Sequence, residues 1–526
     1  MKRIFSLLLT ALLAAGCTVK TTVEVTATTP ASVGHLYITV KEIWLTTQTD
    51  ATPSSGQWVR KVLSDPVTLD LATLNDGATT SFDSLVTDAG TYAQIRLVLA
   101  GVEDDLTKSA SALGLNWNDA VQYLDASGTS HLVPLELPYP GGSLLSPISI
   151  KLGGSSLLKA STSTDETGSV IFDIDALHGL VILDDDGDTR ALLNPDLQAA
   201  DASRSGTITG TLDLSGIATG IDGIVVSAEV VDADNTRHSI AKSTRPRSDG
   251  SFTLYPLPAD DSDQGSYDIV VHGPGISTLL VTGVPVQAGQ STSLQASSIP
   301  LSAAASFLVN TNTTVYGGTR AEFYQTLPTD SKPYLIASAP VNPFGAGFDA
   351  DLALSTGPLV RGAYNGGSAI SFSTTDPQEG LARYQLATDS HWRARSEFQA
   401  VAGNSAGSGA TQFIGLLQPA LPANASAGSI SGTIFFGTTG RYDSLQVIVS
   451  RGGQIVDTLD LGSSIGANSA VNFTIAGVPA LTADAVYDLS VRAWNSADPG
   501  DTLVRAALTS QVDLRQGSMS TLSLQL

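Results

Sequence analysis

The chain has 526 residues and a formal net charge of −23. Such acidity argues against binding to nucleic acid and against electrostatic docking on anionic lipid head groups, because both partners repel negative charge. Charged residues make up only 15% of the chain and hydrophobic residues 42%, so the composition is that of a folded protein and not of a disordered acidic tail.

The N-terminal residues have the pattern of a secretory signal. Lys2 and Arg3 precede an apolar run over 4–13, which is too short to span a bilayer. Residues 13–17, Leu-Ala-Ala-Gly-Cys, resemble a bacterial lipobox, in which the cysteine is lipidated and becomes the first residue of the mature chain. This resemblance implies that residues 1–16 are removed, that Cys17 carries lipid and that 17–20 form a short tether. An ordinary cleaved signal peptide is the alternative.

Cys17 is the only cysteine, so the exported chain has no thiol left for a disulfide or a thiolate metal site. Several acyl chains at Cys17 hold a protein on a membrane without a transmembrane helix. In lipoproteins an Asp after the cysteine is the usual signal for inner-membrane retention, and this chain has Thr18 there. We therefore expect a cell-envelope protein that is anchored on the outer membrane. It could face either the periplasm or the outside of the cell.

Short β-branched runs bounded by Gly, Pro, Asp or Ser predict strands along most of the chain. Helical patterns are confined to 106–113 and 117–123, and both are brief. The sequence thus predicts an all-β protein of several β-sandwich domains in tandem, the first of them with a minor helix. The clearest strand patterns lie at 36–40, 93–99, 223–231 and 445–449.

The segment 21–200 carries several sequence features in a characteristic order. Residues 89–97 read Ala-Gly-Thr-Tyr-Ala-Gln-Ile-Arg-Leu, followed by Phe-Asp-Ile-Asp at 172–175 and Leu-Leu-Asn-Pro at 192–195. In this order the segment resembles domain-of-unknown-function family 4382. The resemblance implies a surface or envelope β-domain with no established biochemical role. The acidic turn that members often carry after the first strand is replaced here by Ala-Thr-Thr-Pro at 27–30.

An internal repeat marks two further domains. Residues 206–212, Gly-Thr-Ile-Thr-Gly-Thr-Leu, recur at 428–434 as Gly-Ser-Ile-Ser-Gly-Thr-Ile. A later Tyr-Asp pair at 267–268 recurs at 487–488. Each copy has about 100 residues and about seven strand candidates, which is the size and rhythm of a β-sandwich.

The two copies occupy 201–302 and 425–526 and resemble the transthyretin-like, carboxypeptidase-regulatory type of sandwich. That family is mostly structural or adhesive and carries no transferable catalytic residue. Strand-like runs at 307–315 and 334–339 lie between the copies, so we expect 303–424 to form a further β-sandwich.

The sequence offers little for catalysis. Residues 403–407, Gly-Asn-Ser-Ala-Gly, match the nucleophile elbow of hydrolases, but the last histidine is His391, so the order Ser, acid, His cannot be completed. We expect a loop there and a protein that is not an enzyme. The alternative is a hydrolase with an unrecognised site, which requires residues such as His178, Asp173 and Asp175 to cluster in a cleft.

An acidic turn is the candidate metal site. Asp184, Asp186 and Asp188 flank Gly187 and offer oxygen ligands of the kind that calcium prefers. The EF-hand spacing fails, because the position that needs an acid is Ile182. The favoured interpretation is a polar hairpin turn in which glycine supplies a positive φ. Calcium is the alternative, and no other cofactor is expected.

The five tryptophans are spread over several domains, and aromatic residues make up only 6% of the chain, which is low for a glycan-binding platform. We therefore expect a non-catalytic cell-envelope lipoprotein that serves as a surface scaffold, stalk or adhesive protein. Its partners would be the membrane, through Cys17, and an envelope protein or glycan, and no nucleic acid. A calcium- or glycan-binding surface protein is the alternative.

Overall fold

The computed structural model describes most of the chain after the N-terminal segment. The described residues are 18–49, 51, 57–88, 91–102, 104–138, 143–147, 158–159, 167–185, 188–260, 262, 264–327, 330–375, 384–401, 410–436, 442–462, 470–481, 486–495, 504–515 and 519–526. Within them the chain is almost entirely β, as the sequence predicts.

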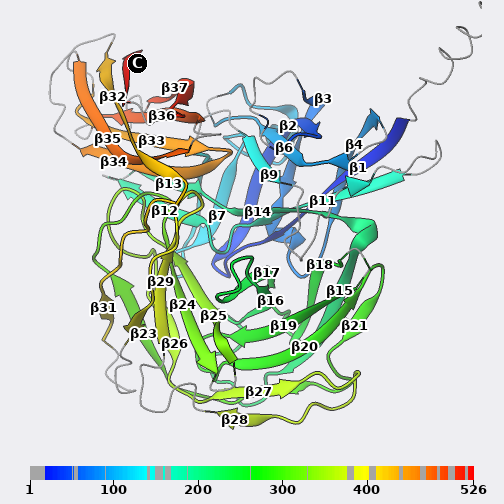
Figure 1. Ribbon diagram of the computed structural model, residues 1–526. Coiled ribbons are helices and arrows are strands. Elements are labelled where there is room, and N and C mark those ends of the chain that lie inside the picture. Colours follow the sequence, from blue (N-terminus) through cyan, green and yellow to red (C-terminus); the bar gives the residue numbers. More distant parts are fainter. Residues whose placement is uncertain are drawn as a thin grey trace, which may run out of the picture.

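The strands form four modules that we number along the chain (Figure 1). Module 1 is drawn in blue to cyan, module 2 in green, module 3 in lime to yellow, and module 4 in orange to red. Each module has its own large cluster of buried apolar side chains. The modules span residues 18–201, 205–300, 306–414 and 425–525.

Module 1 is built mainly from two sheets, with strand orders β14-β11-β1-β4 and β12-β13-β8-β7-β2-β6-β9, and β3 pairs with β2. A two-stranded sheet pairs β10 with β5. The strands are β1 (Thr18–Thr28), β2 (Val33–Thr46), β3 (Val59–Asp70), β4 (Thr80–Asp88), β5 (Thr91–Tyr92), β6 (Gln94–Leu99), β7 (Ala120–Leu124), β8 (Ser130–Glu136), β9 (Ser143–Pro147), β10 (Leu158–Lys159), β11 (Thr167–Asp175), β12 (Leu180–Asp185), β13 (Asp188–Leu193) and β14 (Asp196–Asp201).

The helical content of module 1 is smaller than the sequence predicts. The first candidate becomes the single turn α2 (Lys108–Ala112), whose N-cap Thr107 accepts a hydrogen bond from the Ala110 amide. The second candidate, 117–123, is wrong, because Ala120–Leu124 forms β7 between β2 and β8. Pairing on both sides decides the conformation of so short a segment against its local pattern. Two 3-10 turns, η2 (Leu71–Leu74) and η3 (Ala202–Arg204), complete the elements.

Modules 2, 3 and 4 share one topology of two facing sheets. In each module the first strand pairs with the fourth antiparallel and with the seventh parallel, and the second strand lies between the third and the fifth. The middle segment is therefore a third copy of the repeated sandwich, although its sequence matches the other copies only faintly. Module 2 comprises β15 (Ser205–Asp213), β16 (Val225–Val231), β17 (His238–Thr244), β18 (Ser251–Pro258), β19 (Gln264–His272), β20 (Leu279–Gln287), β21 (Ser291–Ser293) and the short β22 (Ile299–Pro300).

Module 3 contains an insertion between its fourth and fifth strands. The inserted β27 (Leu359–Ala363) pairs with β20, and β28 (Ser373–Thr375) pairs with β27, so both extend the sheet of module 2. The segment expected as one domain at 303–424 thus contributes to two modules. The other strands of module 3 are β23 (Ser306–Thr311), β24 (Arg320–Leu327), β25 (Asp330–Pro340), β26 (Leu352–Ser355), β29 (Tyr384–Asp389), β30 (Gln399–Val401) and β31 (Gln412–Ile414).

Module 4 comprises β32 (Ala425–Phe435), β33 (Ser444–Arg451), β34 (Gln454–Gly462), β35 (Ala470–Leu481), β36 (Val486–Trp494), β37 (Val504–Asp513) and β38 (Met519–Gln525).

One buried tyrosine recurs in the fifth strand of all three sandwiches. Tyr267 donates its hydroxyl to the Pro258 carbonyl at 2.6 Å, and Tyr384 donates to the Ser355 carbonyl at 3.1 Å. Tyr487 makes the same bond to the Pro479 carbonyl. In each case the acceptor lies at or near the end of the fourth strand, so the bond ties the two sheets of the sandwich together.

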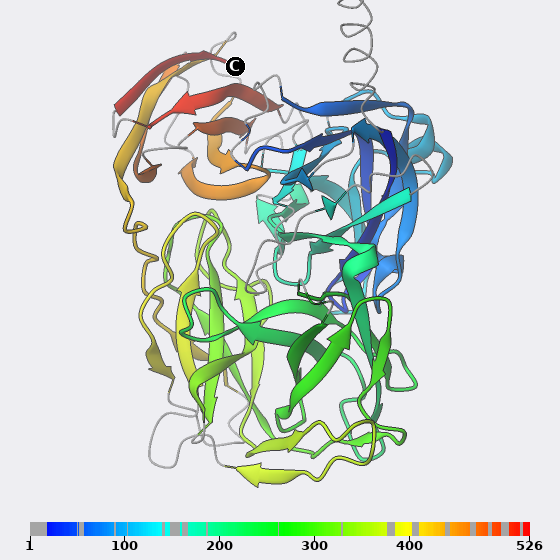
Figure 2. The same cartoon turned by 45° about the vertical axis from the view of Figure 1, so that its right-hand side comes forward.

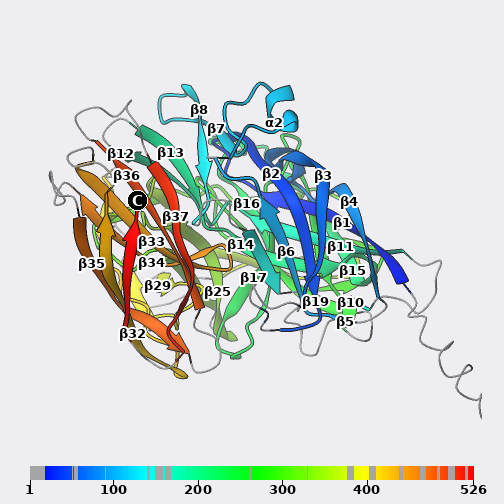
Figure 3. The same ribbon diagram turned by 90° about the horizontal axis from the view of Figure 1, so that it is seen from above.

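The four modules close into a ring-like arrangement instead of a line (Figures 1 and 2). Seen from above, module 4 lies beside module 1, although the two are the most distant in sequence (Figure 3). Contacts such as Arg190 with Gln446 and Asn194 with Ile455 join these two modules. Strand β1 begins at Thr18, within the segment expected to be a tether, so module 1 starts directly after Cys17.

Candidate functional site

Several of the sequence-predicted site residues lie outside the described residues, namely Cys17, Asp186 and the serine-containing stretch 403–407. Lipidation of Cys17 therefore stays a prediction, and so does the expectation of a loop at 403–407.

The acidic turn lies between β12 and β13, which pair antiparallel as the hairpin interpretation expects. The register sets Asp184 opposite Thr189 and Asp188 opposite Asp185. Asp184 and Asp188 are thus not cross-strand partners. Within the described part of the chain, no group of three or more His, Cys, Asp or Glu side chains is arranged to hold a metal ion. Calcium at this turn stays the untested alternative to the hairpin turn.

The residues of the hydrolase alternative do come together, at the contact between modules 1 and 2. Asp173 and Asp175 lie near the end of β11, and His178 lies in the turn that follows. The His178 Nδ1 atom lies 2.9 Å from Asp175 Oδ2. Ser243 of β17 donates a hydrogen bond to the same carboxylate oxygen at 2.8 Å, and Lys242 donates to Asp173 at 2.7 Å.

This cluster lacks the geometry of an acyl-transfer triad. In such a triad the serine hydroxyl is hydrogen-bonded to the histidine, which takes its proton. Here Ser243 and His178 both bind Asp175, so the serine proton is directed at the carboxylate and not at the imidazole. The arrangement instead supplies Asp175 with one partner from its own module and one from module 2.

The electrostatics of the cluster favour an ion pair between Asp175 and His178. Burial raises the pKa of Asp175, but the charge of His178 and the hydrogen bonds from His178 and Ser243 lower it to about 2. Burial lowers the pKa of His178, but the charge and hydrogen bond of Asp175 raise it above its ordinary value. Both partners therefore favour their charged forms.

A second buried ion cluster joins modules 1 and 3. Arg320, at the start of β24, contacts Asp196 of module 1 and lies 2.8 Å from Asp389 and 3.1 Å from Glu322 of its own module. Burial lowers the pKa of Arg320, but the three carboxylates raise it well above its usual range. A guanidinium has five donors in a fixed fork, so it can hold several carboxylates in one geometry.

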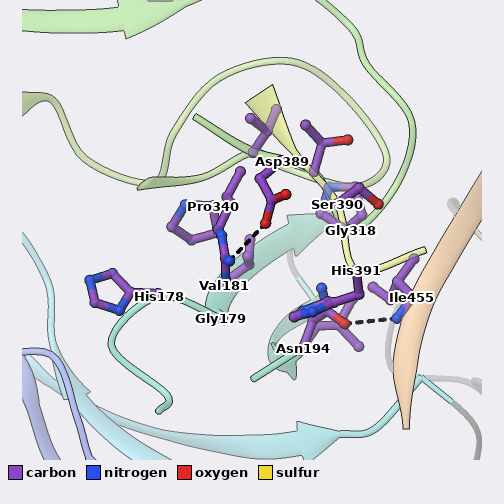
Figure 4. Close-up of a pocket in the computed structure, with 15 residues that line it drawn as sticks. His178, Gly179, Val181, Asn194, Gly318, Pro340, Asp389, Ser390, His391 and Ile455 are labelled. Carbon is purple, nitrogen blue, oxygen red and sulfur yellow. Dashed lines mark hydrogen bonds and ion pairs between the residues drawn. The ribbon is translucent and has the colours of Figure 1, made fainter. Parts of the chain in front are cut away.

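A small cavity lies where modules 1, 3 and 4 meet (Figure 4). His178, Asn194, Arg320, His391 and Ile455 are among the residues that line it. Its volume of about 20 Å³ has room for about one water molecule. Small-molecule sites are typically roughly 300–1,000 Å³. The cavity is therefore a packing void at the junction and has no room for a substrate of ordinary size.

Strand β34 of module 4 docks on the Leu-Leu-Asn-Pro stretch that ends the family resemblance. Asn194 Oδ1 accepts a hydrogen bond from the Ile455 amide at 2.7 Å, and the Pro195 carbonyl accepts one from Gln454 at 3.2 Å (Figure 4 shows the first bond). The Gln454 amide nitrogen also lies 3.1 Å from His391 Nδ1 of module 3. Three modules thus meet at one side chain of β34.

Two further arginines bridge modules from buried positions. Arg190 lies 2.9 Å from Glu136 within module 1 and donates to Gln446 of module 4 at 2.8 Å. Arg393 of module 3 lies 3.3 Å from Asp457 of module 4. Burial raises the pKa of Asp457 to about 6, although Arg393 acts to lower it. Charge is therefore buried at the contacts of module 4 with both module 1 and module 3.

Sequence reasoning missed these bridging residues. The partners of Arg190, Arg320 and Arg393 in other modules are more than sixty positions away in the sequence. One weak signal was available, because Arg190 directly precedes the apolar run 191–193 and Arg320 opens a mostly buried strand, in a chain with only 27 Lys and Arg residues. A charged residue in such a run is expected to have a buried partner.

The tryptophans are at least partly covered by other side chains. Each of the five is buried or half-buried. Trp44 and Trp58 contact each other at a ring-centroid distance of 5.8 Å, and the Arg60 guanidinium lies 3.8 Å from the Trp44 ring. None of the helices in the described ranges is long and apolar enough to cross a bilayer.

Comparison with known proteins assigns part of the chain. Residues 18–195 match the family model described as "Domain of unknown function (DUF4382)". No curated protein matches the chain.

Among solved structures, the chain is similar to two B repeat units of the collagen binding protein of Staphylococcus aureus, with 9% identity, 97% of this chain and 99% of that chain covered, and a TM-score of 0.12. It is also similar to a DUF3823 family protein from Parabacteroides merdae, with 9% identity, 59% and 99% covered, and a TM-score of 0.13. A streptococcal ancillary pilin gives 9% identity, 61% and 98% covered, and a TM-score of 0.12.

Likenesses at these TM-scores carry no argument about function, so the assignment rests on the family match and on the strand topology. The protein consists of a DUF4382 domain at residues 18–195 followed by tandem β-sandwich modules.

Proposed function

We propose that the protein is a non-catalytic lipoprotein of the cell envelope that presents a rigid binding surface made of four fixed β-modules. The observation that carries this proposal is the Arg320 cluster, which fixes module 3 on module 1 through Asp196. A scaffold whose modules are held in one geometry loses little freedom when it binds a large partner, and this favours affinity.

The arrangement of the modules favours a compact scaffold over an extended stalk. A stalk requires modules that touch only their neighbours in sequence, as in a solenoid. Here module 4 contacts module 1 through Arg190 and Asn194, and module 3 contacts module 1 through Arg320. Loops at the ends of the sandwiches are then the surfaces available to a partner.

The start of β1 bears on the orientation of the protein at a membrane. With lipid on Cys17 and β1 beginning at Thr18, module 1 would lie directly against the bilayer. Strands β27 and β28 lie at the end of the molecule away from the start of β1 (Figures 1 and 2). That end is the one we propose to face a partner.

Anchoring and adhesion are tested with three strains: one with the natural chain, one with Cys17→Ala, and one without the chain. Anchored protein is expected in the membrane fraction for the natural chain and in the soluble fraction for Cys17→Ala. Cells with the anchored chain are expected to be retained better on a mucin-coated surface, or to aggregate with one another more readily. Equal retention and equal aggregation of all three strains would count against an adhesive role.

A further inference from the structure

One buried amine and one buried acid face each other across the contact between modules 1 and 2. Lys242 Nζ of β17 lies 2.7 Å from Asp173 Oδ1 of β11. The two side chains are only 2% and 9% exposed. The side-chain carboxyl carbon of Asp173 is bonded to that oxygen, so the nitrogen lies next to the atom with which it would react.

The surroundings of this pair offer few hydrogen-bond partners to its charged groups. An ammonium group has three donors, and among the described residues Asp173 is the one acceptor within hydrogen-bond distance of Lys242 Nζ. Burial raises the pKa of Asp173, and the neighbouring Asp175 and Asp196 raise it too, although Lys242 lowers it. Moving one proton from the nitrogen to the oxygen converts a buried ion pair into an amine and a carboxylic acid, which are cheaper to bury.

We propose that Lys242 and Asp173 condense to an amide, which links module 1 covalently to module 2. The nitrogen lone pair attacks the Asp173 carbonyl carbon and a C–N bond forms. The C–O bond to the acid hydroxyl breaks, and that hydroxyl leaves with a proton from the nitrogen as one water molecule. No atom is oxidised or reduced, so the step needs no co-reactant.

The contact holds both strands in place around the reacting atoms. Ser243, next to Lys242, donates to Asp175 at 2.8 Å, and Thr28 donates to the Ser243 carbonyl at 2.7 Å. Such fixed geometry replaces a bimolecular encounter with an intramolecular one. Exclusion of water from the pair also disfavours hydrolysis of the amide once it has formed.

A matched control lies in module 1. Lys61 Nζ approaches Asp83 Oδ1 to 2.5 Å, which is as close as the proposed pair, but these side chains are 37% and 24% exposed. Hydration stabilises the charged amine and carboxylate there. Proximity alone therefore predicts amides at both pairs, whereas burial predicts one only at Lys242.

The test is tryptic peptide mapping of the full chain by mass spectrometry. Trypsin does not cut after an acylated lysine or between Arg245 and Pro246. We expect peptide 160–190 joined to peptide 238–247, with a mass one water molecule below the sum of the two. Cleavage after Lys61 is expected to be normal. Free peptide 160–190 together with cleavage after Lys242 would overturn the proposal.

Two variants confirm the chemistry without relying on stability. Lys242→Arg keeps a cation for Asp173 but cannot form this amide, and Asp173→Ala removes the acid. Both are expected to give only unlinked peptides, with normal cleavage after Lys242 in Asp173→Ala. A linked peptide that persists in Asp173→Ala would show that another residue holds Lys242, and the assignment to Asp173 would fail. Because mapping is done on denatured protein, a variant that folds poorly still gives a result.

Discussion

At the scale of single residues, buried charge is concentrated where modules meet. Arg320 and Arg393 each form an ion pair with a residue of another module. Ion pairs of this kind add little net stability over apolar packing, but removing one partner leaves an uncompensated charge. Their contribution is therefore specificity of the docked arrangement, and it is measurable by substitution.

Replacing Arg320 tests this view. Arg320→Met removes the cation shared by Asp196, Asp389 and Glu322 and is expected to destabilise the fold by about 3–5 kcal/mol. Calorimetry should show a clearly lower unfolding midpoint. Arg515→Met, at an exposed pair with Asp513, is the control and should leave the midpoint unchanged. Equal midpoints for the two variants would contradict a structural role of the Arg320 cluster.

His238 predicts a pH dependence at the contact of modules 2 and 3. Its ring stacks on Tyr334 at 3.8 Å and lies 3.8 Å from Asp268 and 3.6 Å from Asp330, yet neither ring nitrogen has a hydrogen-bond partner in the described structure. Burial lowers the pKa of His238 below 6.5, although both carboxylates act to raise it, and Lys332 adds to the lowering.

The lowered pKa of His238 determines how the stability of the fold changes with pH. The unfolded chain binds a proton at His238 before the folded chain does, so stability is full above pH 6.5 and is lost as the pH falls below it. Each pH unit costs up to about 1.4 kcal/mol for this group. Unfolding midpoints of the natural chain and His238→Gln between pH 8 and 5 should converge or cross toward low pH. A difference that is independent of pH would contradict the prediction.

At the scale of elements, the tyrosines of the fifth strands form the hydrogen bond that links the two sheets in each of the three sandwiches. Tyr384→Phe removes the hydroxyl and leaves the buried Ser355 carbonyl without that donor. The expected cost is about 1–3 kcal/mol, and Tyr267→Phe should behave alike. Urea denaturation followed by fluorescence measures it. Tyr364→Phe is the control, since no hydrogen bond of its hydroxyl is found in the described residues, and a similar loss there would refute the assignment.

The β12–β13 hairpin carries the prediction on calcium. Because the acidic turn lacks the spacing of a calcium-binding loop, with Ile182 at a position that needs an acid, we expect calcium and chelator to give the same thermal midpoint. A rise of several degrees with calcium that disappears when Asp184, Asp186 and Asp188 are changed to Ala would instead establish a calcium site.

At the scale of the whole molecule, closure of module 4 on module 1 sets the overall dimensions. A compact chain of about 510 residues has a radius of gyration near 24 Å, whereas four modules end to end would give roughly 40 Å. Small-angle X-ray scattering on the full chain should give a value close to the first figure. A value near the second would mean that the contacts of Arg190 and Asn194 do not persist in solution.

The sequence by itself determined the all-β class, the first domain and the two outer sandwiches. Alternation of apolar and polar residues predicts a strand from the local sequence alone. Motifs such as 206–212 and 428–434 repeat because each sandwich needs the same small and apolar residues at the same places. The sequence also predicts a sandwich at 303–424, but not that it shares the topology of the other two, since its fifth strand keeps Tyr384 but little else of the pattern.

Only the tertiary structure decided how the modules meet. Segment 117–123 became β7 because neighbouring strands pair with it on both sides, and β27 joined the sheet of module 2 although it lies within the sequence of module 3. Arg320 and Lys242 met their partners across distances that no local pattern encodes. Buried ion pairs depend on which surfaces dock, and docking depends on the three-dimensional shape of whole modules and not on the spacing of residues along the chain.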